Sequence, residues 1–333
     1  MHDDFQSLVA DISGIGHQWH ADVIVANARN NAARVTNTVA DLKGAGHGRA
    51  VVVSAGPSLH STSTLDRLAA ARRDGVSIVA IDGSYLKCLR AGIVPDYVVT
   101  LDPHPTRMVR WFGDPELEKN AASDDYFTRQ DLDIDFRNES VRRNLENMLL
   151  VDRFAAQSKL VISVTAPTSL VDRVEQAGFD RYWWTPLVDD PAAADSMTAQ
   201  MYQHARCPAF NTGGNVGTAA WVFARFWLGC EQVAVIGMDL GYRMDLPKTQ
   251  TQTYYELQAL LGVDDVPEHF FPVLHNPHTR SDSYIDPTYQ WYRANLLDML
   301  KASGSSLYNC SGDGNLFGEG VIWQDIETFM GAE

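Results

Sequence analysis

RAVVVSAGPSL, residues 49–59, is the stretch that decides the fold of this chain of 333 residues. Four consecutive apolar residues at 50–53 predict a strand that is buried on both faces, as in a parallel sheet. A turn of small residues at 54–57 follows, and a second β-branched run at 76–81 comes about one helix length later. This order predicts a βαβ unit, whose ligand crevice lies beyond the carboxyl ends of its strands.

The turn at 54–57 has features that suit an anion. Ala55 and Gly56 let a ligand approach the backbone, and Pro57 fits the first position of a helix. Ser58 then presents polar groups at the helix start, where anions are favoured. We therefore expect a phosphate site here, with Ser54 also in contact. An ordinary strand-to-helix turn explains the same residues equally well, because Gly-Pro-Ser is weaker than a full Walker or dinucleotide fingerprint.

Composition and charge limit the kind of partner. With 45% apolar and 10% aromatic residues, the chain should fold around a large core. Its net charge of −15 argues against nucleic acid or an anionic membrane as a partner, so we expect a small ligand whose phosphate is held locally. The N-terminal residues lack a basic segment followed by an apolar one, and no apolar run is long enough to span a membrane.

The cysteines favour a reduced, cytoplasmic location. Four are scattered along the chain without a C-x-x-C pair, which argues against both a zinc site and a disulfide scaffold. They are Cys88, Cys207, Cys230 and Cys310.

Strands and helices are expected to alternate, which predicts an α/β fold with a mainly parallel sheet and helices on both faces. One or two helices over 4–43, interrupted at Gly14 and Gly16, make a helical N-terminal segment (1–48) ahead of a Rossmann-like domain (49–333). We expect strands at 50–54, 77–82, 97–101, 161–164, 181–186, 232–237 and 307–310. We expect helices at 64–73, 84–91, 169–177, 216–228, 289–300 and 322–330.

Two regions read as loops. Residues 105–150 are charged and irregular, which predicts an insertion or a loop-rich lid over the edge of the sheet. Residues 243–288 hold few periodic runs and many Tyr, His, Pro and Asp residues, a composition typical of active-site loops.

Two aspartates end successive expected strands near the Gly-Pro-Ser turn. Asp82, which precedes Gly83, and Asp102 are placed to hydrogen-bond a ribose or a base edge, or to bind a metal. Capping of the following helix or loop is the structural alternative. The stretch Leu101-Asp102-Pro103 is not a dense acidic cluster, so a metal role is the weaker of the functional options.

Further candidates come from the second half of the chain. Thr212, Gly213 and Gly214 precede an expected helix, and Asp239 follows an expected strand. Three tyrosines follow that strand end, and a phenol can donate to a phosphate oxygen without adding charge. They are Tyr242, Tyr254 and Tyr255. Packing of loop aromatics is the commoner reason for such residues.

Three histidines lie close together in HFFPVLHNPH. His269, His275 and His278 are spaced by six and three residues, which does not match a helical zinc motif, so we expect no metal site. A single histidine acting as a general base fits better, and His278 has the polar neighbours Arg280 and Asp282.

Several ordered motifs resemble one family. SAGPSL at 54–59, GIVPDYVVTLDP at 92–103 and the stretch 212–242 resemble the bacterial motility-associated Maf glycosyltransferases, in the domain also called MptE-like. YNCSGDGNLFGEG at 308–320 is similar to the closing segment of that domain. The resemblance runs from about residue 25 to the end of the chain. It implies a glycosyltransferase, with a hydroxyl on a protein such as flagellin or on a glycan as the acceptor.

The same order of motifs is similar to a family of bacterial sialyltransferases with a Rossmann-like fold. In that family the turn reads Gly-x-Gly-Pro-Ser-Leu, and Ser54 takes the place of its first glycine. Asp102 takes the place of an asparagine, and residues 278–280 correspond to a catalytic His-Ser-Lys. The resemblance implies inverting transfer of a sialic, pseudaminic or legionaminic type of nonulosonic acid from a CMP-sugar, without a further cofactor. It also implies His278 as the general base, and Arg280 would then face the departing phosphate or the sugar carboxylate.

Archaeal relatives suggest another enzyme. They transfer pyrophosphate from ATP to 6-hydroxymethyl-dihydropterin, and they carry an acidic strand end suited to magnesium that Asp102 provides only in part. This diphosphokinase is the alternative activity, and a non-catalytic nucleotide-binding assembly module is a third interpretation. A homo-oligomer is compatible with each of them.

Overall fold

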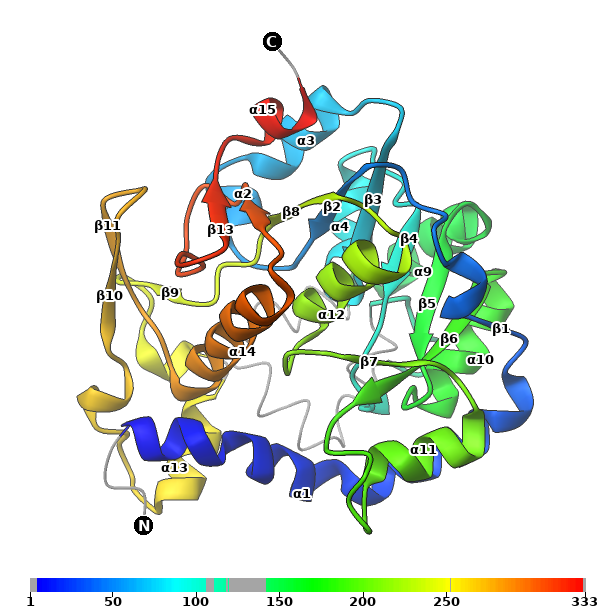
Figure 1. The fold of residues 1–333 in the computed structure, drawn as a ribbon, viewed down its shortest axis with the longest axis horizontal. Helices are drawn as coiled ribbons and strands as arrows, with labels where there is room; N and C mark the ends of the chain where they lie inside the picture. The colour runs from blue at the N-terminus through cyan, green and yellow to red at the C-terminus, as the bar shows by residue number, and fades with distance from the viewer. Residues whose placement is uncertain (1–4, 106–110, 118, 120–141, 252, 332–333) are drawn as a thin grey trace.

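A ten-stranded sheet runs through the molecule, and helices pack around it (Figure 1). The structure is a computed structural model that describes residues 5–105, 111–117, 119, 142–251 and 253–331, without the side chains of residues 10–20. All strand pairs of the large sheet are parallel, which confirms the predicted α/β fold with a mainly parallel sheet. Its strands are β1 (Asn37–Thr38), β2 (Arg49–Val53), β3 (Val76–Ile81), β4 (Tyr97–Val99), β5 (Lys159–Ser163), β6 (Asp180–Leu187), β7 (Ala209–Asn211), β8 (Gln232–Ile236), β12 (Leu307–Asn309) and β13 (Val321–Trp323).

The order of the strands reverses at β2. The hydrogen-bonded path is β1-β6-β5-β4-β3-β2-β8-β12-β13, with β7 paired to β6. The chain therefore builds outward from β2 as far as β6, and then returns to place β8 on the other side of β2. A reversal of this kind leaves a crevice beyond the carboxyl ends of the two central strands. Residues 54–57 leave β2 at this crevice, and residues 237–241 leave β8 there.

Alternate residues of the strands enter two cores, which is why the β2 sequence is apolar throughout. Val52 packs with residues of η2 (Val39–Leu42), α12 (Val216–Val222) and α14 (Pro287–Ser303) on one face. Val51 and Val53 pack on the other face with α2 (Ser58–Ser61), α3 (Thr64–Ala71), α4 (Asp82–Arg90) and α15 (Ile326–Met330). Helices thus cover both faces, as predicted.

The remaining helices complete these layers. They are α1 (Phe5–Asn31), α9 (Asn144–Phe154), α10 (Thr168–Ala177), α11 (Met197–Ala205) and α13 (Tyr254–Leu261), and a π-helical stretch, η4 (Phe223–Trp227), extends α12. In Figure 1, α1 crosses the molecule from α13 to α11. Among the helices that the structure describes, none combines the length and the apolar character needed to cross a lipid bilayer.

The N-terminal segment differs from the expectation of broken helices up to residue 43. Helix α1 runs through Gly14 and Gly16 without a break and ends at Asn31. The side-chain amide of Asn31 donates to the carbonyls of Val164 and Ala166 at 2.9 and 2.8 Å, which fixes the helix end on the sheet. The chain then forms η1 (Ala32–Arg34) and β1, and β1 joins the edge of the large sheet beside β6.

A second, antiparallel sheet corrects the prediction that residues 243–288 form loops. Its order is β10 (Val273–Asn276), β11 (Ser281–Tyr284) and β9 (Tyr242–Arg243). Tyr242, Tyr254 and Tyr284 are buried in a separate core with residues of α13 and α1. The aromatic residues that suggested an active-site loop are therefore mostly core residues of this small subdomain.

The other differences are local. The helix expected at 322–330 starts only at Ile326, because residues 321–323 pair with β12 as strand β13. Helix α11 and strand β7 have no counterpart in the expected elements. Of the insertion or lid predicted at 105–150, residues 106–110, 118 and 120–141 lie outside the described residues.

The buried side chain of Arg173 connects separate described parts of this 105–150 region. Arg173 of α10 is 4% exposed, and its guanidinium donates to the carbonyls of Phe112 and Gly113, each at 3.0 Å. It also donates to the Met148 carbonyl at 3.3 Å and to a carboxylate oxygen of Asp152 at 2.7 Å. The backbone at 112–113 and helix α9 are therefore anchored to the same side chain.

Candidate functional site

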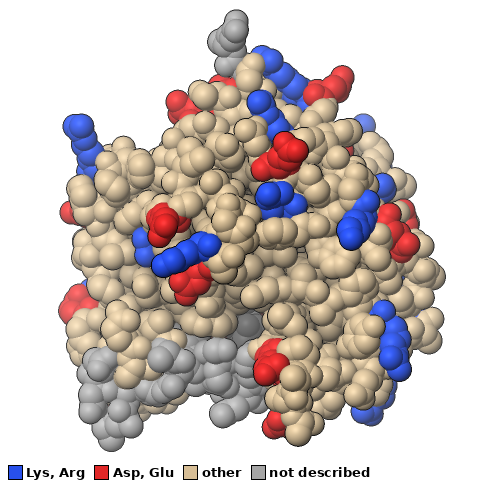
Figure 2. Space-filling model, in the orientation of Figure 1, with Lys and Arg blue, Asp and Glu red and all other residues tan. Residues whose placement is uncertain are grey.

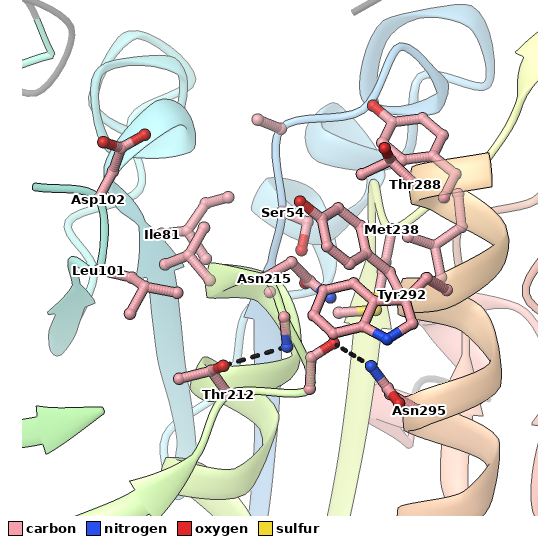
Figure 3. A pocket seen from close by; sticks show the side chains of 18 of the residues that line it. Ser54, Ile81, Leu101, Asp102, Thr212, Asn215, Met238, Thr288, Tyr292 and Asn295 are labelled. Atoms are coloured by element: carbon pink, nitrogen blue, oxygen red, sulfur yellow. Dashed lines mark hydrogen bonds between the residues drawn. The ribbon is translucent and has the colours of Figure 1, made fainter. Parts of the chain in front are cut away.

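A cavity of about 1060 Å³ lies at the carboxyl edge of the sheet, where the strand order reverses. In Figure 3, Thr288, Tyr292 and Asn295 project from α14 on one side, and Leu101 and Asp102 lie on the opposite side. All the predicted nucleotide-binding residues except Ser58 and Tyr242 line it. Those that do are Ser54, Gly56, Pro57, Asp82, Gly83, Asp102, Thr212, Gly213, Gly214 and Asp239. The structure thus brings distant motifs together around one space, while their roles in binding stay predictions.

The helix start at Ser58 is occupied by a side chain of the protein itself. The backbone N–H of Ser58 donates to Asp239 Oδ2 at 2.8 Å, and its hydroxyl donates to Asp239 Oδ1. Gly56 is required for this approach, because a Cβ there would lie 2.6 Å from the Gly237 carbonyl oxygen and 2.7 Å from Asp239 Oδ2. Asp239 thus already supplies an anion to Ser58 at the helix start, and a role of Ser58 in binding a phosphate stays a prediction. Pro57 precedes the four-residue helix α2 as its N-cap rather than as its first residue.

Two ionisable groups lie behind this turn. Burial raises the pKa of Asp239 to about 6, although the hydrogen bonds from Ser58 act in the opposite direction. The ammonium group of Lys87 donates to the Ala55 carbonyl at 2.9 Å. Desolvation lowers the pKa of Lys87, and the charge of Asp239 counteracts this effect. A cation therefore contacts the 54–57 turn although it is not itself among the described residues of the cavity lining.

Ser54 carries a hydroxyl that the described residues leave without a hydrogen-bond partner. The residue is 5% exposed and lines the cavity next to the start of α12. A Cβ placed on Gly217 of α12 would lie 2.8 Å from Ser54 Oγ, which shows how closely the two segments meet. Because a buried hydroxyl without a partner is costly, Ser54 is suited to bind a ligand or a water molecule.

The two aspartates at neighbouring strand ends shape the turns that follow them. Asp82 is the first residue of α4, and its carboxylate accepts the N–H of Gly83 at 2.6 Å. The carboxylate of Asp102 accepts the N–H of His104 at 2.8 Å. Asp102 therefore closes the loop that follows it, as the structural alternative predicts, whereas Asp82 is not the N-cap of α4, which is Ile81. Both residues still line the cavity. Within the described part of the chain, no group of three His, Cys, Asp or Glu side chains is placed to hold a metal ion.

The loop at 212–214 is held by a hydrogen bond within the loop and by contacts with α14. Thr212 Oγ1 accepts the N–H of Gly214 at 3.1 Å, and the Asn295 amide donates to the Gly213 carbonyl at 3.5 Å (Figure 3). Gly214 has a φ of +88°, and a Cβ there would lie 2.1 Å from the ring of Trp291. The glycine therefore serves the close contact with the indole as well as the backbone turn.

The predicted catalytic pair lies outside the lining of the cavity. His278 and Arg280 are in the turn between β10 and β11, and the ring of His278 stacks on Trp323 of β13 with 5.0 Å between centroids. The backbone N–H of His278 donates to Asn276 Oδ1 at 2.9 Å, which fixes the turn. His275 forms the carboxylate pair instead, with Asp282 at 2.7 Å across the two strands.

The phenols predicted as phosphate donors have protein acceptors. The Tyr242 hydroxyl donates to Asp286 Oδ2 at 2.9 Å in a buried site, and the Tyr254 hydroxyl donates to Asp265. Asp286 also accepts the hydroxyl of Thr253 at 2.7 Å, which leaves Tyr242 as part of the subdomain core.

The sequence reasoning missed the wall made by α14. One stripe of this helix faces the cavity over four turns, at spacings of three and four residues. Its members are Thr288, Trp291, Tyr292, Asn295, Asp298, Met299 and Ala302, together with Tyr289 near the helix start. Leu296 and Leu300 lie in the core, which Tyr292 and Met299 of the stripe also contact. The available signal was that apolar and aromatic residues occupy more of this helix than the single stripe that a surface helix needs.

The cavity lining is acidic. It includes the carboxylates of Asp82, Asp102, Asp189, Asp239, Glu256 and Asp298. Over the ranges of sequence that the structure covers, no Lys, Arg or His side chain is part of the lining. On the face of the molecule in Figure 2, Lys and Arg side chains lie interspersed with Asp and Glu.

Comparisons with known proteins agree with this architecture. Residues 24–117 match the sequence model of a family described as 6-hydroxymethylpterin diphosphokinase MptE-like. A solved structure of a Maf glycosyltransferase from Magnetospirillum magneticum AMB-1 is similar, with a TM-score of 0.54 and 15% sequence identity. The match covers 93% of this chain but 38% of that chain. The curated proteins contain no match. The predicted resemblance is thus confirmed: the chain carries an MptE-like segment at residues 24–117 and has the fold of a Maf glycosyltransferase.

Proposed function

We propose that this protein is a glycosyltransferase that binds a nucleotide-activated sugar in the cavity beside β2 and β8. The observation that carries the proposal is the position of the cavity, at the strand-order reversal of a fold shared with a Maf glycosyltransferase. Fold alone does not define chemistry, so the residues around the cavity must supply it. Ser54 offers a buried hydroxyl there, and the 212–214 loop offers backbone groups.

The donor that fits best is a CMP-nonulosonic acid, as the sialyltransferase resemblance implies. A CMP-nonulosonic acid carries one phosphodiester and one carboxylate, whereas the triphosphate of ATP brings more negative charge into an acidic cavity. Lys87, whose ammonium group donates to the Ala55 carbonyl, adds one positive charge at the 54–57 turn, which suits a donor with a single phosphate group. Asp82 and Asp102 are acceptors placed to receive hydroxyls of the ribose or the amino group of the base.

The proposed reaction is a single displacement with inversion. The hydroxyl oxygen of the acceptor bonds to the anomeric carbon, and the bond from that carbon to the phosphate oxygen breaks. CMP leaves with the electron pair of the broken bond, and the hydroxyl proton passes to a general base. The acceptor would be a glycan or a protein, and flagellin is the protein that the family resemblance suggests.

The assignment of His278 as this base, with Arg280 beside the leaving phosphate, rests on the resemblance alone. Both residues lie in the β10–β11 turn and not in the cavity lining. His278→Ala compared with His275→Ala tests the assignment: loss of transfer with unchanged CMP affinity only in His278→Ala supports it. Full transfer in both variants would show that neither histidine is the general base.

Calorimetry with CMP, CDP, ATP and GDP tests the nucleotide. We expect CMP to bind, and Ser54→Ala to weaken it roughly three- to tenfold, the effect of one hydrogen bond. The same variant should leave the stability of the ligand-free protein within about 0.5 kcal/mol, because its hydroxyl has no described partner to lose. Ser158→Ala is the control, since that buried hydroxyl donates to the Pro95 carbonyl at 2.7 Å and neither residue lines the cavity. Preferential, magnesium-dependent ATP binding would overturn the proposal.

A pterin diphosphokinase is the second candidate, and the family match at residues 24–117 favours it. That segment includes the 54–58 turn, Asp82 and Asp102, so it spans the part of the cavity nearest the expected phosphate. Incubation with magnesium ATP and 6-hydroxymethyl-dihydropterin separates the two candidates, because only the kinase releases AMP. CMP binding without turnover of any donor would instead indicate a non-catalytic nucleotide-binding module.

A further inference from the structure

The side of the cavity formed by α14 carries three aromatic side chains, which suit a ring-shaped ligand. Tyr289, Trp291 and Tyr292 all line the cavity, with Trp291 and Tyr292 5.5 Å apart between ring centroids. Each is half-buried, so part of each ring is accessible from the cavity. Cavities that bind small molecules are typically lined by such aromatic surfaces, with a few polar groups that fix orientation.

These rings are fixed in place. Trp291 lies against the backbone of Gly214, where a Cβ would overlap the indole. Tyr289 stacks on Tyr242 with 4.9 Å between centroids and 13° between planes, and the Tyr242 hydroxyl is held by Asp286. The wall is therefore ordered before a ligand arrives, which reduces the entropy cost of binding.

The polar groups beside the rings select the charge of the ligand. Glu256 of α13 and Asp298 of α14 line the same cavity as the three rings, and Asn295 adds an amide. Carboxylates accept hydrogen bonds from hydroxyls and repel anions. As no basic side chain of the described residues joins this lining, a phosphate or a sugar carboxylate is disfavoured here.

We propose that the α14 wall, formed by Tyr289, Trp291 and Tyr292 with Glu256 and Asp298, is the acceptor subsite and takes a neutral saccharide. The C–H face of a pyranose ring packs on the aromatic rings, and its hydroxyls donate to the carboxylates. The inference rests on the proposed transferase function and adds to it that the acceptor is a neutral glycan ring rather than a bare protein hydroxyl. The anionic donor sugar and its phosphate occupy the end of the cavity near Ser54, where the ammonium group of Lys87 contacts the 54–57 turn.

Saturation-transfer NMR titrations on the full chain, with CMP present, test this subsite. The probes are methyl β-D-galactopyranoside, which is neutral, and methyl β-D-galactopyranosiduronic acid, which has the same ring but is anionic and is not the proposed donor sugar. We expect the neutral glycoside to bind, and Tyr292→Leu to weaken it roughly three- to tenfold. Tyr202→Leu on α11 is the matched control, because Tyr202 is an exposed tyrosine outside the cavity lining. Asp298→Asn should improve binding of the anionic probe.

The outcomes separate the two proposals. Equal affinity of the neutral glycoside for wild type and Tyr292→Leu, or stronger binding of the anionic probe to the wild type, overturns the acceptor subsite. An absence of glycoside binding overturns it as well. If CMP fails to bind while the glycoside still depends on Tyr292, the proposed transferase function fails and the saccharide subsite stands. Circular dichroism of Tyr292→Leu shows whether the variant is folded, and Tyr292→Phe, which keeps the ring, should restore most of the affinity.

Discussion

Asp239, which follows β8, accepts both the backbone N–H and the hydroxyl of Ser58 at the start of α2. The two residues stand on either side of the strand-order reversal, so this contact ties together the two loops that form the floor of the crevice. The anion bound by the amide at the end of the Gly-Pro-Ser turn is therefore a carboxylate of the protein itself.

The pH dependence of stability should reveal Asp239. Its pKa is raised to about 6 in the folded protein from an ordinary value near 3.8. Between these values the folded protein binds the proton and the unfolded chain does not, so the contribution of this group to stability increases as the pH falls from 6 to 4. Relative to Asp239→Asn, the wild type should gain up to about 3 kcal/mol over that window. Urea unfolding of both proteins from pH 4 to 7.5 measures the gain.

Asp245 supplies the control for this experiment. It is exposed and Arg243 lowers its pKa, so Asp245→Asn should give no gain in the same direction. Parallel stability curves for wild type and Asp239→Asn would show that the carboxylate is ionised in both states across the window.

Gly214→Ala should damage the cavity wall. The new Cβ would overlap the indole of Trp291. The alanine would also have to adopt the positive φ of this position, +88°. Gly262→Ala separates these effects, because Gly262 has a φ of +67° but nothing within 4 Å of a Cβ. We expect Gly262→Ala to cost about 1–2 kcal/mol from backbone strain and Gly214→Ala to cost clearly more. Urea unfolding gives both values, and equal costs would mean that Trp291 moves away freely.

Arg173 should be among the most sensitive polar residues. Arg173→Met leaves the carbonyls at 112 and 113 without their buried donor, and a cost of about 3–5 kcal/mol is expected. Arg34→Met removes a more exposed pair, Arg34 with Asp172, and should cost less than about 1 kcal/mol. Thermal unfolding monitored by circular dichroism compares the two, and similar melting temperatures would contradict the anchoring role.

All four cysteines should be unreactive in the native protein. They are free and buried, and burial raises the pKa of Cys88, Cys207 and Cys310 to about 12 and that of Cys230 to about 11. Because the thiolate is the reactive form, a thiol reagent such as DTNB should label them only after denaturation. Rapid labelling of one thiol without denaturant would indicate local opening at that position.

Local signals made most of the large sheet predictable. The strand at 49–53 is continuous in apolar residues and bounded by Gly48 and a small-residue turn, so its limits were found within one residue. The pairing of β2 with β8 was not visible, because these strands are far apart in sequence and only the tertiary fold joins them. The short strands β10 and β11 have too few residues for an alternating pattern to be recognised, and the aromatic residues around them have the composition of a loop.

The site was predicted only in part, for a physical reason. Motif reasoning finds residues that follow strands, and Ser54, Asp82, Asp102 and Asp239 do meet at one cavity. It does not show which side-chain groups are already engaged, as with Ser58. It also gives no information on which face of a helix meets a cavity, so the stripe of Trp291 and Tyr292 was read as part of a closing helix.

The position of β2 in the middle of the sheet has a consequence for biosynthesis. One side of β2 can pair with β3 as soon as both leave the ribosome, but its other side waits for β8, about 180 residues later. At roughly 5–20 residues per second, that edge of a Val-rich strand stays unpaired for about 10–40 s. An open, apolar strand edge is a site of aggregation. The nascent chain should therefore depend on holding chaperones until residue 236 emerges, and fragments that end before β8 should be insoluble.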